Sequence, residues 1–141
     1  MIEIKKELNI RTKELRNVLK KAFKQEKLDY DSIHPSYNIK STRNDAQKLF
    51  ITCYVEKNNP YGIHIDNRLE VEKWVIDIVI MKPDLTFEII NKLKNNGFNY
   101  EEYNGECNGE FKGHIKLVEL EKDTSNNEIK DINIKLLKLF Q

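Results

Sequence analysis

The apolar positions near the start of the chain follow two different periods. In residues 2–11, apolar side chains lie at even positions and polar side chains at odd positions, with Lys6 as the exception, and this is the period of a half-buried strand. The same stretch places Ile4 and Leu8 near one helical face with Leu15, so a strand and a short first helix that breaks around residues 9–11 both remain open. From residue 13 to about residue 25 the period is helical, and Thr12 is the expected N-cap. The apolar stripe of this helix consists of Leu15, Val18, Leu19, Ala22 and Phe23.

A period of two follows from residue 37 onward and predicts strands. Residues 37–41 and 48–56 predict a hairpin, and residues 63–66 predict a short strand. Residues 69–81 predict one long strand that bends or bulges, because its length exceeds that of a usual strand. In that strand Asp77 is expected to face solvent, while Trp74, Ile76, Ile78 and Ile80 face the core. Residues 98–103 and 111–121 predict a second hairpin, around two Asn-Gly pairs.

Two more helices are predicted from their ends. One begins at Asp84, the expected cap after Pro83, and ends at Gly97 with Phe98 as the apolar residue that follows. The last helix begins at Ser125, whose spacing to Glu128 forms a capping box. The apolar face of this last helix consists of Ile129, Ile132, Leu136 and Phe140.

These elements predict one α+β domain over residues 1–141. We expect an antiparallel sheet of about five to six strands, with three helices packed mainly on one face, in the order α-β-β-β-α-β-β-α. That order resembles the small α/β fold of secretion chaperones and their stand-alone relatives. The resemblance covers most of the chain and implies a chaperone-like topology. Secretion chaperones are usually acidic, whereas the formal net charge of this chain is +1.

Composition narrows the class of protein. Leu, Ile, Val and Phe make up 42 of 141 residues, which is enough for the chain to form its own core. The two cysteines, Cys53 and Cys107, form neither a disulfide framework nor a zinc-site spacing. No apolar run approaches the roughly 18 residues of a membrane span, and the first residues lack a signal peptide pattern. We therefore expect a cytoplasmic protein without membrane contact, metal or cofactor. The many Lys, Ile and Asn codons indicate A/T-rich coding, typical of a bacterial, phage or mobile-element gene.

The charge is unevenly divided, and its basic part suggests nucleic acid. Residues 1–60 carry 13 basic and 8 acidic side chains, against 11 and 15 in residues 61–141. Five basic residues share one face of the first helix and could contact phosphates: Lys13, Arg16, Lys20, Lys24 and Lys27. Residues 2–23 resemble the helix-turn-helix of transcription regulators, with residues 8–10 as the turn and residues 12–23 as the recognition helix. This resemblance implies a nucleic-acid-binding regulator, and the competing interpretation is the solvated face of an amphipathic helix.

The histidines suggest a more distant alternative. His64 and Asp66 lie two positions apart on a predicted strand, so they share a face, and His114 lies on another strand. A metal-independent phosphoesterase-type hydrolase could use such residues. Neither histidine, however, is followed two positions later by the hydroxyl that paired-histidine phosphoesterases carry. Nucleotide-binding glycine loops and nucleophile elbows are also missing from the sequence, so we expect a non-enzymatic protein.

The acidic hairpin near residue 100 is the favoured binding site. Tyrosine rings provide rigid contact area, and carboxylates fix the alignment of a partner that carries Lys or Arg. The residues expected to bind a protein partner are Tyr100, Glu101, Glu102, Tyr103 and Glu106. The sequence therefore favours a non-enzymatic protein-binding accessory, regulator or inhibitor, whose partner it does not identify. An ordinary solvated hairpin is the competing interpretation, and a homodimer stays open.

Overall fold

The computed structural model describes residues 2–41, 47–70, 72–107 and 110–141, with side chains described for residues 6–35, 52–70, 72–101 and 113–141. Three α-helices, a short 3-10 helix and six strands follow one another in these residues. In chain order they are α1 (Ile2–Gln25), β1 (Ser32–Ser41), β2 (Gln47–Lys57), β3 (Ile63–Glu70), β4 (Lys73–Ile80), η1 (Pro83–Leu85), α2 (Thr86–Asn95), β5 (Glu101–Cys107), β6 (Glu110–Glu121) and α3 (Asn126–Leu139).

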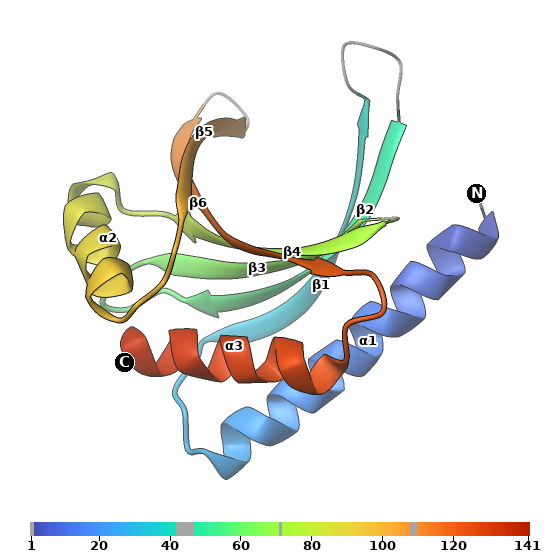
Figure 1. Cartoon of the computed structure of the whole chain (residues 1–141), viewed down its shortest axis with the longest axis horizontal. Helices are drawn as coiled ribbons and strands as arrows, with labels where there is room; N and C mark the ends of the chain where they lie inside the picture. The colour runs from blue at the N-terminus through green and yellow to red at the C-terminus, as the bar shows by residue number, and fades with distance from the viewer. Residues whose placement is uncertain (1, 42–46, 71, 108–109) are drawn as a thin grey trace.

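The six strands form one antiparallel sheet in the order β1-β2-β3-β4-β6-β5. Helices α1 and α3 lie against one face of this sheet, and α2 lies at one end of it (Figure 1). The β1–β2 and β5–β6 hairpins bend away from the helices, so the other face of the sheet is curved inward between them (Figure 1). The predicted α+β class is confirmed, as is the packing of helices mainly on one face.

The first helix is continuous, which settles the alternatives for its first half. Helix α1 runs from Ile2 to Gln25 without a break, so residues 2–11 are helical, and both the strand and the short first helix that breaks around residues 9–11 are wrong. Thr12 is not an N-cap, because it is buried inside the helix. Its Oγ1 donates to the carbonyl oxygens of Leu8 and Asn9, each at 3.0 Å. These bonds to the preceding turn satisfy the hydrogen-bonding capacity of the buried hydroxyl. Because the helix continues on both sides of Thr12, no cap is needed there.

The predicted long strand over residues 69–81 is wrong. Strand β3 continues through Leu69 to Glu70, and β4 begins at Lys73, so four strands separate α1 from α2. Residues 70–73 contain no Gly, Pro, Asn or Asp, the residues that usually mark a hairpin turn. The change of chain direction between β3 and β4 is therefore not marked by turn-forming residues in the sequence. Asp77 does share a face with Val75 and Val79, as expected, but it is fully buried rather than exposed to solvent.

The ends of the last two helices are largely as predicted. Gly97 has φ +80°, and the amide of Phe98 donates to the carbonyl of Leu93 at 3.0 Å, which closes α2. The Oγ of Ser125 accepts from the amide of Glu128 at 3.2 Å, which confirms the cap of α3. The predicted cap at Asp84 is wrong, because that residue lies within η1. Helix α2 begins two residues later, at Thr86.

A pair of buried asparagines joins α3 to the centre of the sheet. Asn67 in β3 and Asn133 in α3 are both fully buried. The Nδ2 of Asn67 donates to Oδ1 of Asn133 at 2.9 Å, and the Nδ2 of Asn133 donates back to Oδ1 of Asn67 at 2.8 Å. The remaining amide protons reach the carbonyl oxygens of Cys53 and Ile129, at 3.2 and 2.8 Å. Both side chains therefore lie in an apolar core with their donors satisfied.

We expect Asn67 and Asn133 to be strongly coupled in stability. Replacing either one with Ala should lower the free energy of unfolding by about 2 kcal/mol, because it leaves the other amide buried and unpaired. The double variant should lose about 1 kcal/mol less than the sum of the single losses. Urea unfolding of the four proteins measures this coupling. Additive losses would show that the two amides act independently.

Candidate functional site

Strand β6 extends beyond its outer neighbour and leaves a step at the edge of the sheet. The pairing of β5 with β6 ends where Glu101 lies opposite Lys116. On its other side β6 stays paired with β4 as far as Glu121. In the described part of the chain, no strand pairs with the outer side of residues 117–121. The register with β4 shifts at this point, so that Leu117 is an extra residue between Lys116 and Val118.

A groove lies at this step, with a volume of about 370 Å³. It combines an aromatic ring, aliphatic side chains and charged groups, and its lining consists of Asn99, Tyr100, Glu101, Lys116, Leu117, Val118 and Glu119. Leu117 and Val118 are half-buried and pack against the core, whereas Glu101 and Glu119 are exposed. The groove therefore offers an apolar floor beside an ionic rim.

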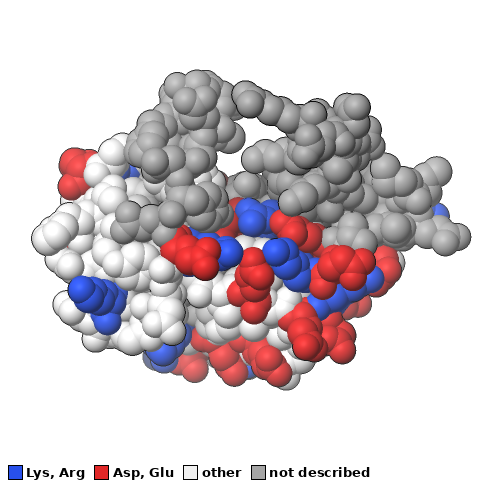
Figure 2. All heavy atoms as spheres, turned by 45° about the horizontal axis from the view of Figure 1, so that its top comes forward, with Lys and Arg blue, Asp and Glu red and all other residues white. Residues whose placement is uncertain are grey.

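The rim of the groove is a chain of exposed ion pairs. The Nζ of Lys116 lies 3.0 Å from Glu101 Oε2 and 3.1 Å from Glu119 Oε1, and the Nζ of Lys73 lies 3.0 Å from the same Glu119 oxygen. Hydrogen bonds from Lys73 and Lys116 lower the pKa of Glu119. Hydrogen bonds to Glu101 and Glu119 raise the pKa of Lys116. Acidic and basic side chains lie next to one another in a band across this side of the molecule (Figure 2).

Two of the five predicted partner-binding residues line this groove. Tyr100 and Glu101 do so, at the point where the chain enters β5. Glu102, Tyr103 and Glu106 belong to β5, and their side chains lie outside the described residues. The β6 residues of the groove are not among those predicted from the sequence. The unequal lengths of the two predicted strands, residues 98–103 and 111–121, are the signal that points to them.

The predicted basic surface is only partly present on α1. Lys13, Lys20 and Lys24 are exposed. The Nε of Arg16 instead donates to the carbonyl oxygen of Ile33 at 3.0 Å, so this side chain ties α1 to β1. Lys27 lies beyond the end of the helix with φ 54°. Because α1 is continuous through residues 8–10, the turn that the helix-turn-helix resemblance requires is not formed, and that prediction is wrong.

A buried ionic cluster lies on the inward-curved face of the sheet. Nη1 of Arg68 lies 2.9 Å from Oδ2 of Asp77 and 3.7 Å from Oδ2 of Asp66, and its Nε lies 3.3 Å from Oε1 of Glu70. Asp66 is 4% exposed and Asp77 is 0% exposed. One guanidinium therefore holds carboxylates from two adjacent strands, which suits a structural role.

The two histidines of the hydrolase alternative lie on strands that are not neighbours in the sheet. His64 shares the face of Asp66, as predicted, but its Nε2 lies 3.8 Å from Oε1 of Glu56. Val79 is the cross-strand neighbour of both His64 and His114, which places the two histidines two strands apart, or about 10 Å. His34 shares the Glu56 oxygen with His64, at 3.5 Å.

Cysteine and metal chemistry have little support in the described residues. Burial raises the pKa of the Cys53 thiol to about 12, against smaller opposing effects from Arg16, so the thiol stays protonated at neutral pH. The side chain of Cys107 lies outside the described residues. Among the side chains that the structure describes, no three His, Cys, Asp or Glu groups are placed to hold a metal ion.

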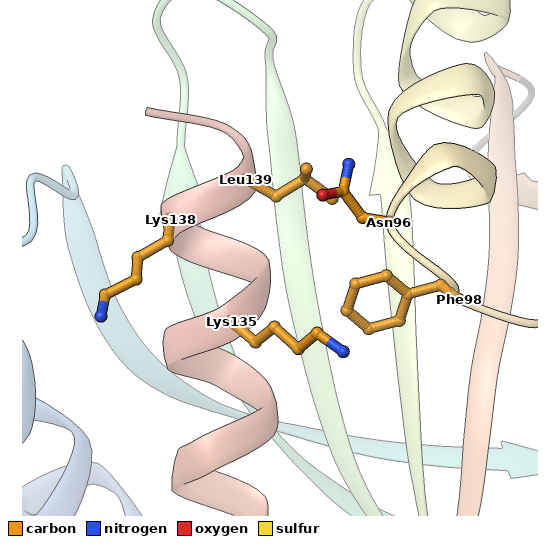
Figure 3. Close-up of a pocket in the computed structure, with 5 residues that line it drawn as sticks. All are labelled: Asn96, Phe98, Lys135, Lys138 and Leu139. Carbon is orange, nitrogen blue, oxygen red and sulfur yellow. The ribbon is translucent and has the colours of Figure 1, made fainter.

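A second pocket lies between α3 and the chain that leaves α2. It has a volume of about 340 Å³ and is lined by Asn96, Phe98, Lys135, Lys138 and Leu139. Lys135 reaches across it toward Phe98, with Nζ 4.7 Å from the ring centroid, whereas Lys138 points away (Figure 3). Nζ of Lys138 lies 3.2 Å from Oε2 of Glu26. The side-chain Nδ2 of Asn96 donates to the Lys92 carbonyl at 2.7 Å. The contact between Lys135 and Phe98 joins α3 to the chain that leaves α2, whereas the ion pair between Lys138 and Glu26 joins α3 to the end of α1.

Comparison of the chain with protein families, with curated proteins and with solved structures found no match. The likeness to secretion chaperones therefore rests on the predicted element order alone, and the structure has one more strand between α1 and α2 than that order. Among the described helices, none combines the length and the apolar character that crossing a membrane requires.

We expect Arg68 to be a stability residue. Replacing Arg68 with Met should lower the free energy of unfolding by about 3 kcal/mol, because buried carboxylates lose their cation. Adding Asp77→Asn should recover part of that loss, since one buried charge is then removed. Urea unfolding of the two single variants and the double variant tests the coupling. If the double variant loses the sum of both single losses, the buried pair does not govern this face.

Proposed function

We propose that this chain is a non-enzymatic protein-binding accessory, regulator or inhibitor that contacts its partner at the β5–β6 edge. The observation that carries the proposal is the groove at the step between these strands, where Tyr100, Leu117 and Val118 lie beside the ionic rim. Aromatic and aliphatic area next to charge is the composition of a protein contact.

The ionic rim suits a surface that exchanges partners. Glu101 and Glu119 share Lys116 at the surface, where ion pairs contribute little to stability because water screens them. A partner's charges can therefore replace these pairs with little loss of folding free energy. Such rim charges act mainly on the rate of association and on the choice of partner.

The polar residues of the inward-curved face support the non-enzymatic part of the proposal. Arg68 holds Asp66 and Asp77, and Glu56 lies beside both His34 and His64. Ser32 donates its Oγ to Oε2 of Glu56 at 2.9 Å, so this carboxylate binds the hydroxyl directly. Nδ1 of His34 lies 3.4 Å from the same hydroxyl, but the hydroxyl proton is donated to Glu56, whereas the nucleophile of a catalytic triad donates its proton to the histidine. These groups are arranged as structural ion pairs and hydrogen bonds.

We expect Tyr100 to be required for partner binding. The chain is immobilised, proteins are captured from a lysate of its source cells, and bound proteins are quantified by mass spectrometry. Replacing Tyr100 with Ala should remove the specific protein, and with the purified partner it should cost over about 2 kcal/mol of binding free energy. Phe87→Ala is the matched aromatic control, because Phe87 is 78% exposed on α2.

A second pair of variants separates binding from folding. Glu101→Arg changes an exposed side chain of the groove, and Glu14→Arg makes the same change on exposed α1. Both variants should give the circular dichroism spectrum of the original chain, and only Glu101→Arg should lose the partner. If the groove variants and their controls capture the same proteins, the β5–β6 edge is not the contact.

A further inference from the structure

We propose that the partner contributes an extended segment, which adds as a strand to the outer side of β6 along residues 117–121. The segment has alternating apolar and cationic side chains. This inference rests on the proposed function and specifies how the β5–β6 edge binds. It follows from three features of that edge, which are its unpaired main chain, the division of its side chains between two faces, and its charge.

The main chain of β6 offers a place for one more strand. Pairing with β5 stops at Lys116, while β6 continues as a strand to Glu121. In an antiparallel ladder every second residue directs its N–H and C=O groups to the same side. Within residues 117–121, every second residue therefore directs its main-chain groups away from β4, and no described strand receives these groups, although the carbonyl of Glu121 accepts from the amide of Thr124 at 3.0 Å. An unpaired edge of this kind binds an extended peptide through main-chain hydrogen bonds.

The side chains of this edge alternate between the two faces of the sheet. Val118 and Leu120 lie opposite Ile76 and Trp74, so they share the face that the helices cover. Glu119 lies opposite Val75, so its side chain is on the other face of the sheet. The side chains of its sequence neighbours, Val118 and Leu120, are on the helix-covered face. Glu121 shares the face of Glu119. Residues of an added strand point to the same side as the residues that they pair with. Apolar residues therefore suit the positions opposite Val118 and Leu120, and cationic residues suit those opposite Glu119 and Glu121.

The charge at the edge favours a cationic segment. The carboxylates of Glu101, Glu119 and Glu121 outnumber the ammonium groups of Lys73 and Lys116 there. Glu121 is exposed and forms no ion pair with any described residue. A Lys or Arg side chain opposite Glu121 would therefore gain a partner without displacing one.

A second copy of this chain fits the edge poorly. Antiparallel pairing of two β6 edges about Glu119 would place this residue opposite itself, and directly opposed like charges destabilise a sheet. Strand β1 is the other edge of the sheet, and Pro35 within it lacks a main-chain N–H to donate. The unpaired part of β6 is thus unfavourable for pairing with a second copy of this chain, and it remains open to a basic chain.

The test uses a synthetic hexapeptide, acetyl-Val-Lys-Val-Lys-Val-Lys-amide, and two N-methylated forms of it. One form carries methyl groups on the Val nitrogens and the other on the Lys nitrogens. An added strand turns only one of these two sets toward β6. We expect the parent peptide to bind with a dissociation constant below about 1 mM by NMR titration. The amide shifts should centre on residues 117–121, and one methylated form should lose binding while the other keeps it.

Charge reversal supplies the matched variants. Replacing Glu119 and Glu121 with Lys should weaken binding of the Lys peptide by about tenfold or more, and should allow the corresponding Val-Glu peptide to bind instead. Glu14→Lys, on exposed α1, is the control and should change neither peptide's affinity. Sedimentation of the free chain should show a monomer, and a dimer that the peptide dissociates would identify a second copy as the occupant.

Three results would overturn strand addition. They are no saturable binding of the parent peptide, an equal effect of both methylated forms, and shifts that centre away from residues 117–121. Each is distinguishable from failure of the proposed function. If Tyr100→Ala still abolishes capture of the natural partner, the edge binds that partner through side chains alone.

Discussion

The reciprocal amide bonds between Asn67 and Asn133 fix the position of α3, and the β5–β6 edge depends on that position. Apolar contacts alone tolerate a sliding helix, whereas two buried amides are satisfied in only one register. With α3 in this register, Lys135 lies over the ring of Phe98, and Phe98 begins the segment that leads through Tyr100 into β5. This packing therefore ties α3 to the segment that leads into β5, beside the part of β6 that β5 leaves unpaired.

The second constraint is that the helices cover only one face of a curved sheet. A flat uncovered face would be solvated, but β4 is buried at every position from Trp74 to Ile80. Its uncovered side is therefore closed by polar neighbours, and Arg68 compensates the charge of Asp66 and Asp77 there. This use of charged groups inside the curve leaves the edges of the sheet as the surfaces where a partner gains most. Strand β1, at one side of the sheet, contains Pro35, whereas the part of β6 that extends beyond β5 carries Glu119 and Glu121.

Sequence patterns predicted the helices and strands better than they predicted how deeply individual side chains are buried. The capping box at Ser125 and the glycine at Gly97 were sufficient to place the ends of α3 and α2, because both signals are local. Alternation placed Asp77 on the correct face, but its burial depends on sheet curvature and on Arg68 from another strand. The Asn67–Asn133 pair joins residues 66 positions apart, and neither residue differs in sequence from an exposed asparagine. The groove depends on where β5 ends relative to β6, which strand periods give only to within a few residues.

Charge on the surface of this fold directs an approaching chain, but it does not hold one. Lys13, Lys20 and Lys24 are exposed on α1, while Glu101, Glu119 and Glu121 lie at the β5–β6 edge. A basic segment is repelled by the first region and attracted by the second, and salt limits both effects to about 10 Å. In the proposed strand addition, main-chain pairing would then stabilise the contact at short range, and it would accept any extended chain. Discrimination among basic chains must therefore come from the two faces of β6, since only an alternating segment places its apolar residues beside Val118 and Leu120 while its cations face the carboxylates.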